Sequence, residues 1–228
     1  MIYVAGEVLC YHLVHTNETK PGAGHTITGI LTTGCSKFRF NFLQEKDKLV
    51  AIQPLGDFDT SESVIIRKEI ERFYDKKVII LNPIAIPPGY MVSQSNGLYE
   101  ADSILNLLSS LLNDTITEVV GLTHTDICTL REAPDMQDRP AFYDIKNIFG
   151  IAHLPGHVCL ISDYRLKDPD PSVLQHRIKT VLLHEMGHNL GLAHCPATQC
   201  LMSDANGKTS VLDRNEGYYC AKCKSKLK

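Results

Sequence analysis

Residues 184–194 of this chain read His184-Glu185-Met186-Gly187-His188-Asn189-Leu190-Gly191-Leu192-Ala193-His194. On a helix, side chains four residues apart lie on one face, so His184 and His188 can both direct a ring nitrogen at one ion about 2 Å away. Glu185 lies roughly 100° around the helix, beside that ion, where a carboxylate can take a proton from a bound water. Gly191 can end the helix in the left-handed conformation, which turns the chain so that His194 supplies a third ligand. The stretch therefore predicts a catalytic zinc site with one open coordination position.

The pattern is longer than chance explains. His-Glu-x-x-His alone would arise in roughly a few per cent of chains of this composition, whereas adding Gly191 and His194 lowers that probability to roughly 10⁻⁴. The preceding residues also fit a helix over 171–190, because Asp170 is a good N-cap and Pro171 suits the first helical position. The core-facing stripe has the spacing i, i+4, i+7, i+8 and consists of Leu174, Ile178, Val181 and Leu182.

Four cysteines follow the third histidine: Cys195, Cys200, Cys220 and Cys223. A Cys-x-x-Cys pair bends its backbone so that both sulfurs face one ion, and a second pair of thiolates would close a tetrahedral shell. This favours a structural zinc site, with two disulfides or four unrelated thiols as the alternatives. The remaining cysteines are scattered singly and show no disulfide framework, so we expect inert buried thiols at Cys10, Cys35, Cys128 and Cys159.

Together these motifs resemble the signature of the archaemetzincin family. The shared run is His-Glu-x-x-His-x-x-Gly-x-x-His-Cys, four residues, Cys200, one residue, Met202, seventeen residues and Cys-x-x-Cys. The resemblance extends over about residues 49–223. Leu98-Tyr99-x-Ala101 resembles the start of that family's second helix, while Phe149–Ala152 and Val158–Ser162 resemble its central strands.

The resemblance implies a metzincin-like α/β fold: a twisted mixed sheet with helices, and an active-site helix followed by a C-terminal subdomain with a four-cysteine zinc site. It implies a zinc metallopeptidase with two zinc ions, one catalytic and one structural. The catalytic ion would be held by His184, His188 and His194, with Glu185 as general base and acid. Met202 would form the Met-turn beneath the metal. The structural ion would be held by Cys195, Cys200, Cys220 and Cys223. Short peptides, with aminopeptidase-like trimming, are the implied substrates.

The chemistry expected of such a site is hydrolysis of a peptide amide. Zinc lowers the pKa of its water toward about 7 and polarises the scissile carbonyl, while Glu185 carries the proton to the leaving amine. The strand near Gly150–His153 would be the sheet edge that pairs with an extended substrate. The alternative is a zinc-stabilised binding or interaction module with a vestigial catalytic site. A binding-only site needs no unliganded carboxylate beside the metal, so Glu185 argues against that alternative.

Composition fits one compact soluble enzyme domain. The chain has 228 residues, of which 43% are hydrophobic and 21% are charged, and its formal net charge is −3. No stretch is long and apolar enough to span a bilayer. The near-neutral charge argues against general nucleic-acid binding. We expect a monomer whose partner is a peptide substrate.

Alternating segments of period 2 and period 3.6 predict an α/β sheet with a helix laid across it. We predict strands at residues 49–54, 77–86, 117–124, 148–153 and 157–163, and helices at residues 62–74, 101–113 and 171–190. Residues 87–89 form a Pro/Gly loop, and residues 125–147 form one long loop, mobile or at the cleft rim. His124 has no spacing partner, so we expect a surface or satisfied core side chain there.

The domain expected to carry the peptidase is residues 49–228, and residues 1–48 are an N-terminal extension outside the resemblance. Within it, Lys20, Gly22–Gly34 and Cys35 faintly resemble a lipoprotein signal that ends at its acylated cysteine. The segment is polar for that purpose. We therefore expect a cytoplasmic enzyme, with an exported lipoprotein acylated at Cys35 as the alternative.

Overall fold

The computed structural model describes residues 2–4, 7–9, 28–33, 36–41, 48–92, 97–132 and 143–227. The chain divides into two units, residues 1–44 and 45–228. The described part of the first unit contains two antiparallel strand pairs, β1 (Ile2–Val4) with β2 (Glu7–Leu9) and β3 (Thr28–Thr33) with β4 (Ser36–Asn41). Cys10 and Cys35 lie outside the described residues, so the expectations for them stay predictions.

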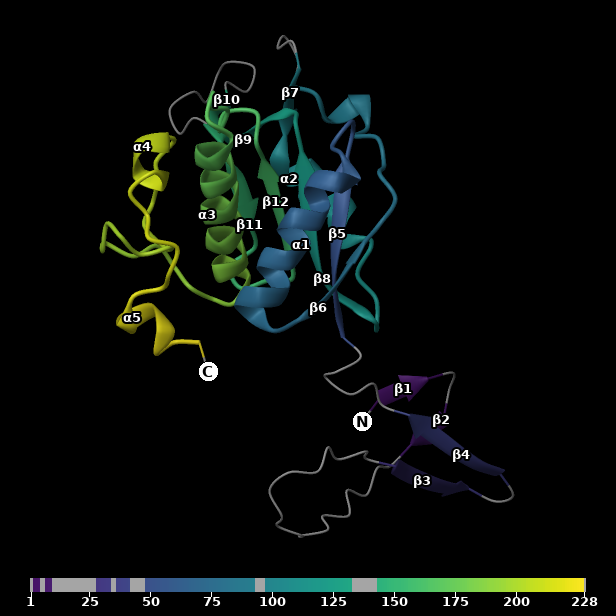
Figure 1. Ribbon diagram of the computed structural model, residues 1–228. Coiled ribbons are helices and arrows are strands. Elements are labelled where there is room, and N and C mark those ends of the chain that lie inside the picture. Colours follow the sequence, from purple (N-terminus) through teal and green to yellow (C-terminus); the bar gives the residue numbers. More distant parts are fainter. Residues whose placement is uncertain are drawn as a thin grey trace. The chain divides into compact units, whose positions relative to one another are not determined.

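A five-stranded sheet forms the centre of the second unit, with the strand order β11-β12-β8-β5-β6 (Figure 1). Its strands are β5 (Leu49–Leu55), β6 (Lys77–Ile80), β8 (Ile116–Thr123), β11 (Gly150–Ala152) and β12 (Val158–Ser162). Neighbouring strands are parallel throughout β12, β8, β5 and β6, whereas β11 is antiparallel to β12 and forms one edge. The sheet is therefore mixed, as predicted.

Helices cover both faces of this sheet (Figure 1). Two long helices, α1 (Thr60–Tyr74) and α3 (Pro171–Asn189), lie on one face, and α2 (Ala101–Ser109) lies on the other. The alternation of side chains along a strand explains this division: Val50 packs in the core cluster of α1 and α3, and Ala51 packs in the cluster of α2. Gly121 lets α2 approach, because a Cβ there would lie 2.5 Å from Leu108 Cδ1.

Acidic N-caps start both long helices. The carboxylate of Asp59 accepts a hydrogen bond from the backbone N–H of Ser61 at 2.7 Å, and Asp170 accepts one from Ser172 at 2.8 Å. Pro171 occupies the first turn of α3, where its missing N–H would have had no helical partner. The predicted start of the active-site helix is therefore confirmed, and α1 begins two residues before its predicted start because Asp59 caps it.

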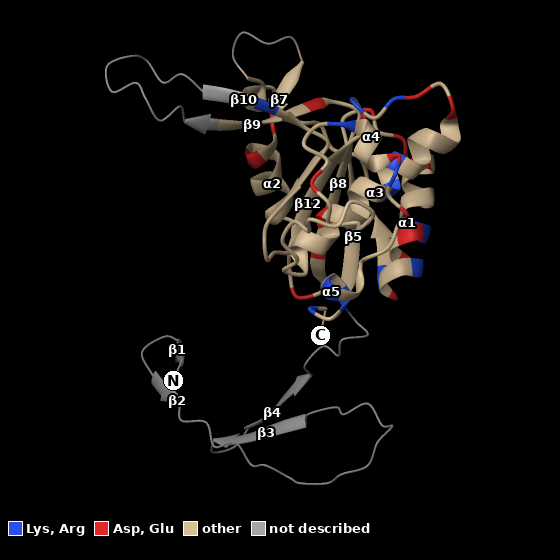
Figure 2. Cartoon of the chain, turned by 90° about the vertical axis from the view of Figure 1, so that its left-hand side faces the viewer, with Lys and Arg blue, Asp and Glu red and all other residues tan. Residues whose placement is uncertain are grey.

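Acidic and basic side chains both occur along α1 (Figure 2). Arg67 pairs with Glu71 at 2.8 Å and Arg72 pairs with Glu69 at 2.7 Å, and these exposed pairs contribute little stability. Lys179 of α3 also reaches Glu69, at 3.2 Å, so one carboxylate joins the two helices that cover this face. Within the described ranges, no helix has the length and apolar composition required to cross a membrane.

Two predicted elements are shorter in the structure. The strand predicted at 77–86 ends at Ile80, because Pro83 has no N–H for a sheet ladder, although Ile84 still makes a parallel bridge with Leu55. The helix predicted at 101–113 ends at Ser109 and continues as turns. The Pro/Gly loop contains a 3-10 turn, η2 (Pro88–Tyr90).

The prediction of one long loop over residues 125–147 is wrong. Strand β9 (Asp126–Glu132) pairs antiparallel with β10 (Tyr143–Ile148), and β7 (Leu98–Glu100) pairs parallel with β9 in a three-stranded sheet. Pro134, Asp135, Asp138 and Pro140, residue types that are common in loops, fall in residues 133–142, outside the described part. Ile127 of β9 is fully buried in the core cluster of α2. This packing explains why β9 is an extended strand and not a loop.

The chain after α3 forms a third core cluster and two short helices, α4 (Thr209–Leu212) and α5 (Ala221–Lys224). This cluster is centred on the buried side chains of Leu183, Leu192, Leu201, Met202 and Tyr219, together with the cysteines that follow His194. The C-terminal segment therefore packs directly on the last turns of α3.

Candidate active site

The last turns of α3 carry two of the three predicted histidine ligands. His184 and His188 lie one turn apart, and their Nε2 atoms are 3.0 Å from each other. The helix then ends in a Schellman motif: Gly191 has φ +86°, its N–H donates to His188 O, and the N–H of Leu192 donates to Gly187 O. This turn brings the ring of His194 to within 5.2 Å of His184 and 4.9 Å of His188, measured between ring centroids. The structure thus brings the three imidazoles together.

Backbone carbonyls fix the protonation of two of these rings. His184 Nδ1 lies 2.6 Å from Leu201 O, and His188 Nδ1 lies 2.7 Å from Leu192 O. Because a carbonyl oxygen only accepts, each Nδ1 carries the proton, and each neutral ring presents a lone pair at Nε2. Burial lowers the pKa of His184 to about 4 and also lowers the pKa of His188, so both rings stay neutral. Two lone pairs 3.0 Å apart repel each other unless a cation lies between them, and this donor set therefore fits a metal ion.

His194 is the most exposed of the three rings. Its side chain is 50% exposed, and Nδ1 lies 3.7 Å from Oδ2 of Asp204. Asp204 was not identified from the sequence, where nothing in the spacing marks it. If Nε2 of His194 bound a metal, the nearby Asp204 carboxylate could orient the imidazole through Nδ1.

Glu185 is buried next to the edge strand. The residue is 7% exposed, and burial raises the pKa of its carboxyl to about 8. A Cβ at Gly150 of β11 would lie 2.9 Å from Glu185 Cγ and 3.0 Å from Oε1, so glycine is needed there to leave room for this side chain. Among the described residues, none donates a hydrogen bond to the carboxylate, which leaves it available to a water or substrate.

These groups line one cavity of about 280 Å³. Residues of the edge strand β11, of α3 and of the segment 201–207 line this cavity. Thr129 of β9 and Lys146 of β10 also border it, so the hairpin that replaces the predicted loop lies at the rim of the cleft. The predicted rim position fits the described residues Thr129 and Lys146, whereas the predicted loop conformation is wrong for the strands on either side of residues 133–142.

Met202 packs against the turn of α3 that carries the two histidines. Its side chain is fully buried, and a Cβ at Gly187 would lie 2.5 Å from Met202 Sδ. Its carbonyl accepts a hydrogen bond from the backbone N–H of Cys195 at 2.7 Å. This bond ties the residue after the third histidine to the methionine.

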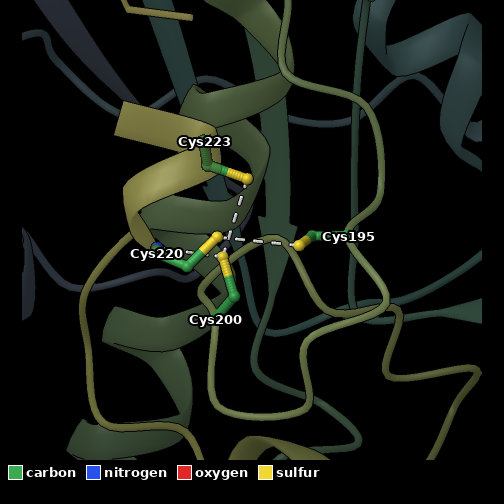
Figure 3. Close-up of side chains that lie close together, drawn as sticks. All are labelled: Cys195, Cys200, Cys220 and Cys223. Atoms are coloured by element: carbon green, nitrogen blue, oxygen red, sulfur yellow. Dashed lines mark hydrogen bonds between the residues drawn. The ribbon is translucent and has the colours of Figure 1, made fainter. Parts of the chain in front are cut away.

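The four predicted cysteine ligands converge on one point (Figure 3). The Sγ atoms of Cys195 and Cys220 are 3.8 Å apart, as are those of Cys200 and Cys223, and all four lie within 4.8 Å of one another. A tetrahedral zinc site with Zn–S distances of about 2.3 Å has edges of roughly 3.8 Å, whereas a disulfide needs about 2 Å. The spacing therefore fits a zinc–thiolate site, and the disulfide alternative is not observed.

Local hydrogen bonds hold these cysteines in place. Cys220 is the N-cap of α5, and the backbone N–H of Cys223 lowers the pKa of the Cys220 thiol to about 7. Asn215 Nδ2 donates to Cys200 O at 2.8 Å. By contrast, Cys128 and Cys159 are fully buried away from the cluster, and burial raises the pKa of both thiols, which makes them unreactive as expected.

A third group of potential metal ligands consists of Glu62, His124 and Asp163. His124 Nδ1 lies 2.9 Å from Asp163 Oδ1, and Lys167 Nζ lies 2.6 Å from Asp163 Oδ2. The His124 ring also stacks on Phe58. The ammonium group already compensates this buried carboxylate, so the cluster is a satisfied ion pair with a partnered histidine, as expected for His124.

Comparison with known proteins agrees with the geometry. The model of peptidase family M54 matches residues 61–228. An archaemetzincin from Methanopyrus kandleri is 33% identical over 136 residues, which cover 60% of this chain and 69% of that protein. A second archaemetzincin, from Haloquadratum walsbyi, is 28% identical over 151 residues, which cover 61% of this chain and 77% of that protein.

Solved structures show the same fold. The crystal structure of the archaemetzincin from Methanopyrus kandleri matches with a TM-score of 0.62 and 26% identity, covering 79% of this chain and 94% of that one. The archaemetzincin from Archaeoglobus fulgidus, complexed with malonate, matches with a TM-score of 0.62 and 25% identity, covering 78% and 99%. The chain therefore belongs to peptidase family M54, the archaemetzincins, and is a zinc metallopeptidase.

Proposed function

We propose that this enzyme hydrolyses peptide bonds in the described cleft, with a catalytic zinc held by His184, His188 and His194. The observation that carries this proposal is the pair of Nε2 lone pairs 3.0 Å apart, whose rings are held by backbone carbonyls. When bound, zinc lowers the pKa of a water toward about 7 and polarises the scissile carbonyl. Met202 packs against Gly187 as an apolar contact, which stabilises the helical turn that carries the two histidines. It does not coordinate the metal.

Glu185 acts as general base and then as general acid. Its carboxylate takes a proton from the water as the water oxygen bonds to the carbonyl carbon, and the C–N bond breaks when that proton is delivered to the amine nitrogen. Two observations support this role: the side chain lines the same cavity as the histidines, and none of the described residues occupies its hydrogen-bonding capacity. Gly150 supports it too, because it leaves the carboxylate room against the edge strand.

The substrate is an extended peptide that adds to the outer edge of β11. One edge of β11 pairs with β12, no described strand pairs with the other edge, and residues of β11 line the cavity. Main-chain hydrogen bonds of this kind bind a peptide with little dependence on its sequence. The small cavity favours short peptides, and aminopeptidase-like trimming is the mode that we propose for them.

A second, structural zinc is held by Cys195, Cys200, Cys220 and Cys223. Four thiolates complete a tetrahedral shell with no open position, so this ion supports the fold and takes no part in hydrolysis. Residues 49–228 form the peptidase domain and residues 1–48 form an N-terminal extension. We further propose a monomeric, cytoplasmic enzyme that does not bind nucleic acid, since a site of reduced thiols suits a reducing compartment.

Purified protein should contain about two zinc ions per chain, one of which is more readily removed by chelators. The three-histidine site should lose its ion first, because it has an open position and an exposed third ligand, His194. Metal analysis during titration with a chelator measures this. A single tightly held ion, with the four thiols still reactive toward a thiol reagent, would exclude the two-site assignment.

Cleavage of a peptide library by the zinc-loaded protein tests the activity. Products should appear with the zinc-loaded enzyme, disappear after chelation and return when zinc is added. Mass spectrometry of the products then distinguishes removal of N-terminal residues from internal cleavage. A library left intact by the fully zinc-loaded protein would contradict the proposed activity.

A further inference from the structure

We propose that Tyr219, together with Tyr74, forms a hydroxyl clamp on α3 that positions the two histidines of the helix. The Tyr219 hydroxyl donates to Leu183 O at 2.7 Å, and the hydroxyl oxygens of Tyr74 and Tyr219 are 2.6 Å apart. Leu183 immediately precedes His184, and Tyr219 immediately precedes Cys220. The clamp therefore links the cysteine site to the ligand-bearing turn, and the inference rests on the proposed zinc site.

Counting protons gives the clamp a direction. The two phenols share two protons among three close contacts, because Tyr74 Oη also lies 3.2 Å from Leu183 O. The two shortest contacts are both hydrogen bonds if Tyr74 donates to Tyr219 and Tyr219 donates to Leu183 O. No proton then remains for the 3.2 Å contact between Tyr74 Oη and Leu183 O. In such a chain each hydrogen bond polarises the next. Burial raises the pKa of both phenols, so both protons stay in place.

Gly187 makes room for this clamp. It is the residue just before His188, and a Cβ there would lie 2.9 Å from Tyr219 Oη and 2.5 Å from Met202 Sδ. Glycine inside a helix is destabilising relative to alanine, so a packing reason is needed at this position. The approach of the tyrosine and the methionine to the same side of the helix supplies that reason.

Aromatic packing keeps Tyr219 in this orientation. Its ring is 3% exposed and meets Phe73 edge-on at 5.5 Å between centroids, and Phe73 meets Tyr74 at 4.9 Å. Phe73 and Tyr74 close the last turn of α1, so three segments distant in sequence meet at Leu183 O. Loss of the Tyr219 hydroxyl should leave this packing in place and remove the shorter hydrogen bond to the helix backbone, so that only the 3.2 Å contact from Tyr74 Oη remains.

Tyr219→Phe, Tyr74→Phe and the exposed control Tyr164→Phe test the clamp in the full chain. The chelator-labile ion is replaced by Co²⁺ while zinc stays on the cysteines, and the visible spectrum, the rate of metal release and kcat and KM are measured. Tyr219→Phe should retain the thiolate zinc, shift the cobalt bands, and change metal release and kcat on the order of 10-fold with KM nearly unchanged. Tyr74→Phe should have a smaller effect, because Tyr219 still reaches Leu183 O, and Tyr164→Phe should have none.

Parent-like cobalt bands and metal release in Tyr219→Phe would overturn the proposal, even if the melting temperature fell. An equal effect of Tyr74→Phe would overturn the proton order on which it depends. If Tyr219→Phe does not fold, Gly187→Ala provides the second test, because the added methyl group must displace the hydroxyl; unchanged bands there would also overturn the clamp. The cobalt and metal-release readouts remain valid if the parent cleaves no peptide, so failure of the proposed activity is recognised separately.

Discussion

Replacing Glu185 with alanine should lower peptide hydrolysis by about 10²–10⁴-fold while both zinc ions stay bound. The carboxylate is the proposed general base, and it is not among the metal ligands, so its removal affects proton transfer and leaves coordination intact. kcat/KM for one peptide from the library, together with zinc content, measures both parts of this expectation.

Glu185→Gln is the matched variant, because the amide keeps the size of the side chain against Gly150 but cannot accept the proton. It should be as inactive as the alanine variant. His188→Ala provides the contrast, because it should lose the catalytic metal as well as the activity. A Glu185→Ala protein that cleaves as fast as the parent would show that another group takes the proton.

Replacing Cys200 with serine should release the structural zinc and lower the free energy of unfolding by several kcal/mol, as the loss of structural zinc sites does. Cys200 lies two residues before Met202, and its carbonyl accepts the hydrogen bond from Asn215. Because the N–H of Cys195 donates to Met202 O, movement of this segment should also displace Met202 and the adjacent His194. Activity should therefore fall although no catalytic residue has changed.

Zinc content, melting temperature and peptidase rate measured on one preparation test this coupling. Cys128→Ser is the control, since it removes a buried thiol outside the cluster and should leave both zinc ions in place. If Cys200→Ser loses one zinc but keeps the parent's melting temperature and full activity, the cysteine site stabilises neither the fold nor the active site.

Local signals in the sequence were sufficient for the active-site helix. Asp170 and Pro171 fix its start, and Gly191 fixes its end through a backbone conformation that few other residues adopt. The histidines and each cysteine pair lie within short segments of the sequence. Their spacing was therefore sufficient to predict which of these residues come together, without knowledge of the fold. The strands β5, β8 and β12 were also found, because each contains a short apolar run, at residues 49–52, 119–122 and 158–161, of the kind that a buried parallel strand needs.

Features that depend on distant contacts could not be read in the same way. Strand β9 looks like a loop when it is grouped with the prolines beyond it, and its extended conformation comes from pairing with β7 and β10. The need for glycine at position 150 arises from Glu185, and the need at position 187 arises from Met202 and Tyr219. Such requirements are set by partners elsewhere in the chain, so no local pattern marks them.

The order of these groups along the chain has a consequence for protein synthesis. A ribosome makes His184, His188 and His194 before it makes Tyr219, Cys220 and Cys223. A nascent chain that ends at the third histidine has every proposed ligand of the catalytic ion, yet it lacks all four cysteines and the hydroxyl that reaches Leu183 O. The supports proposed for the cleft, the cysteine site and the Tyr219 hydroxyl, are therefore complete only after residue 223 has been made.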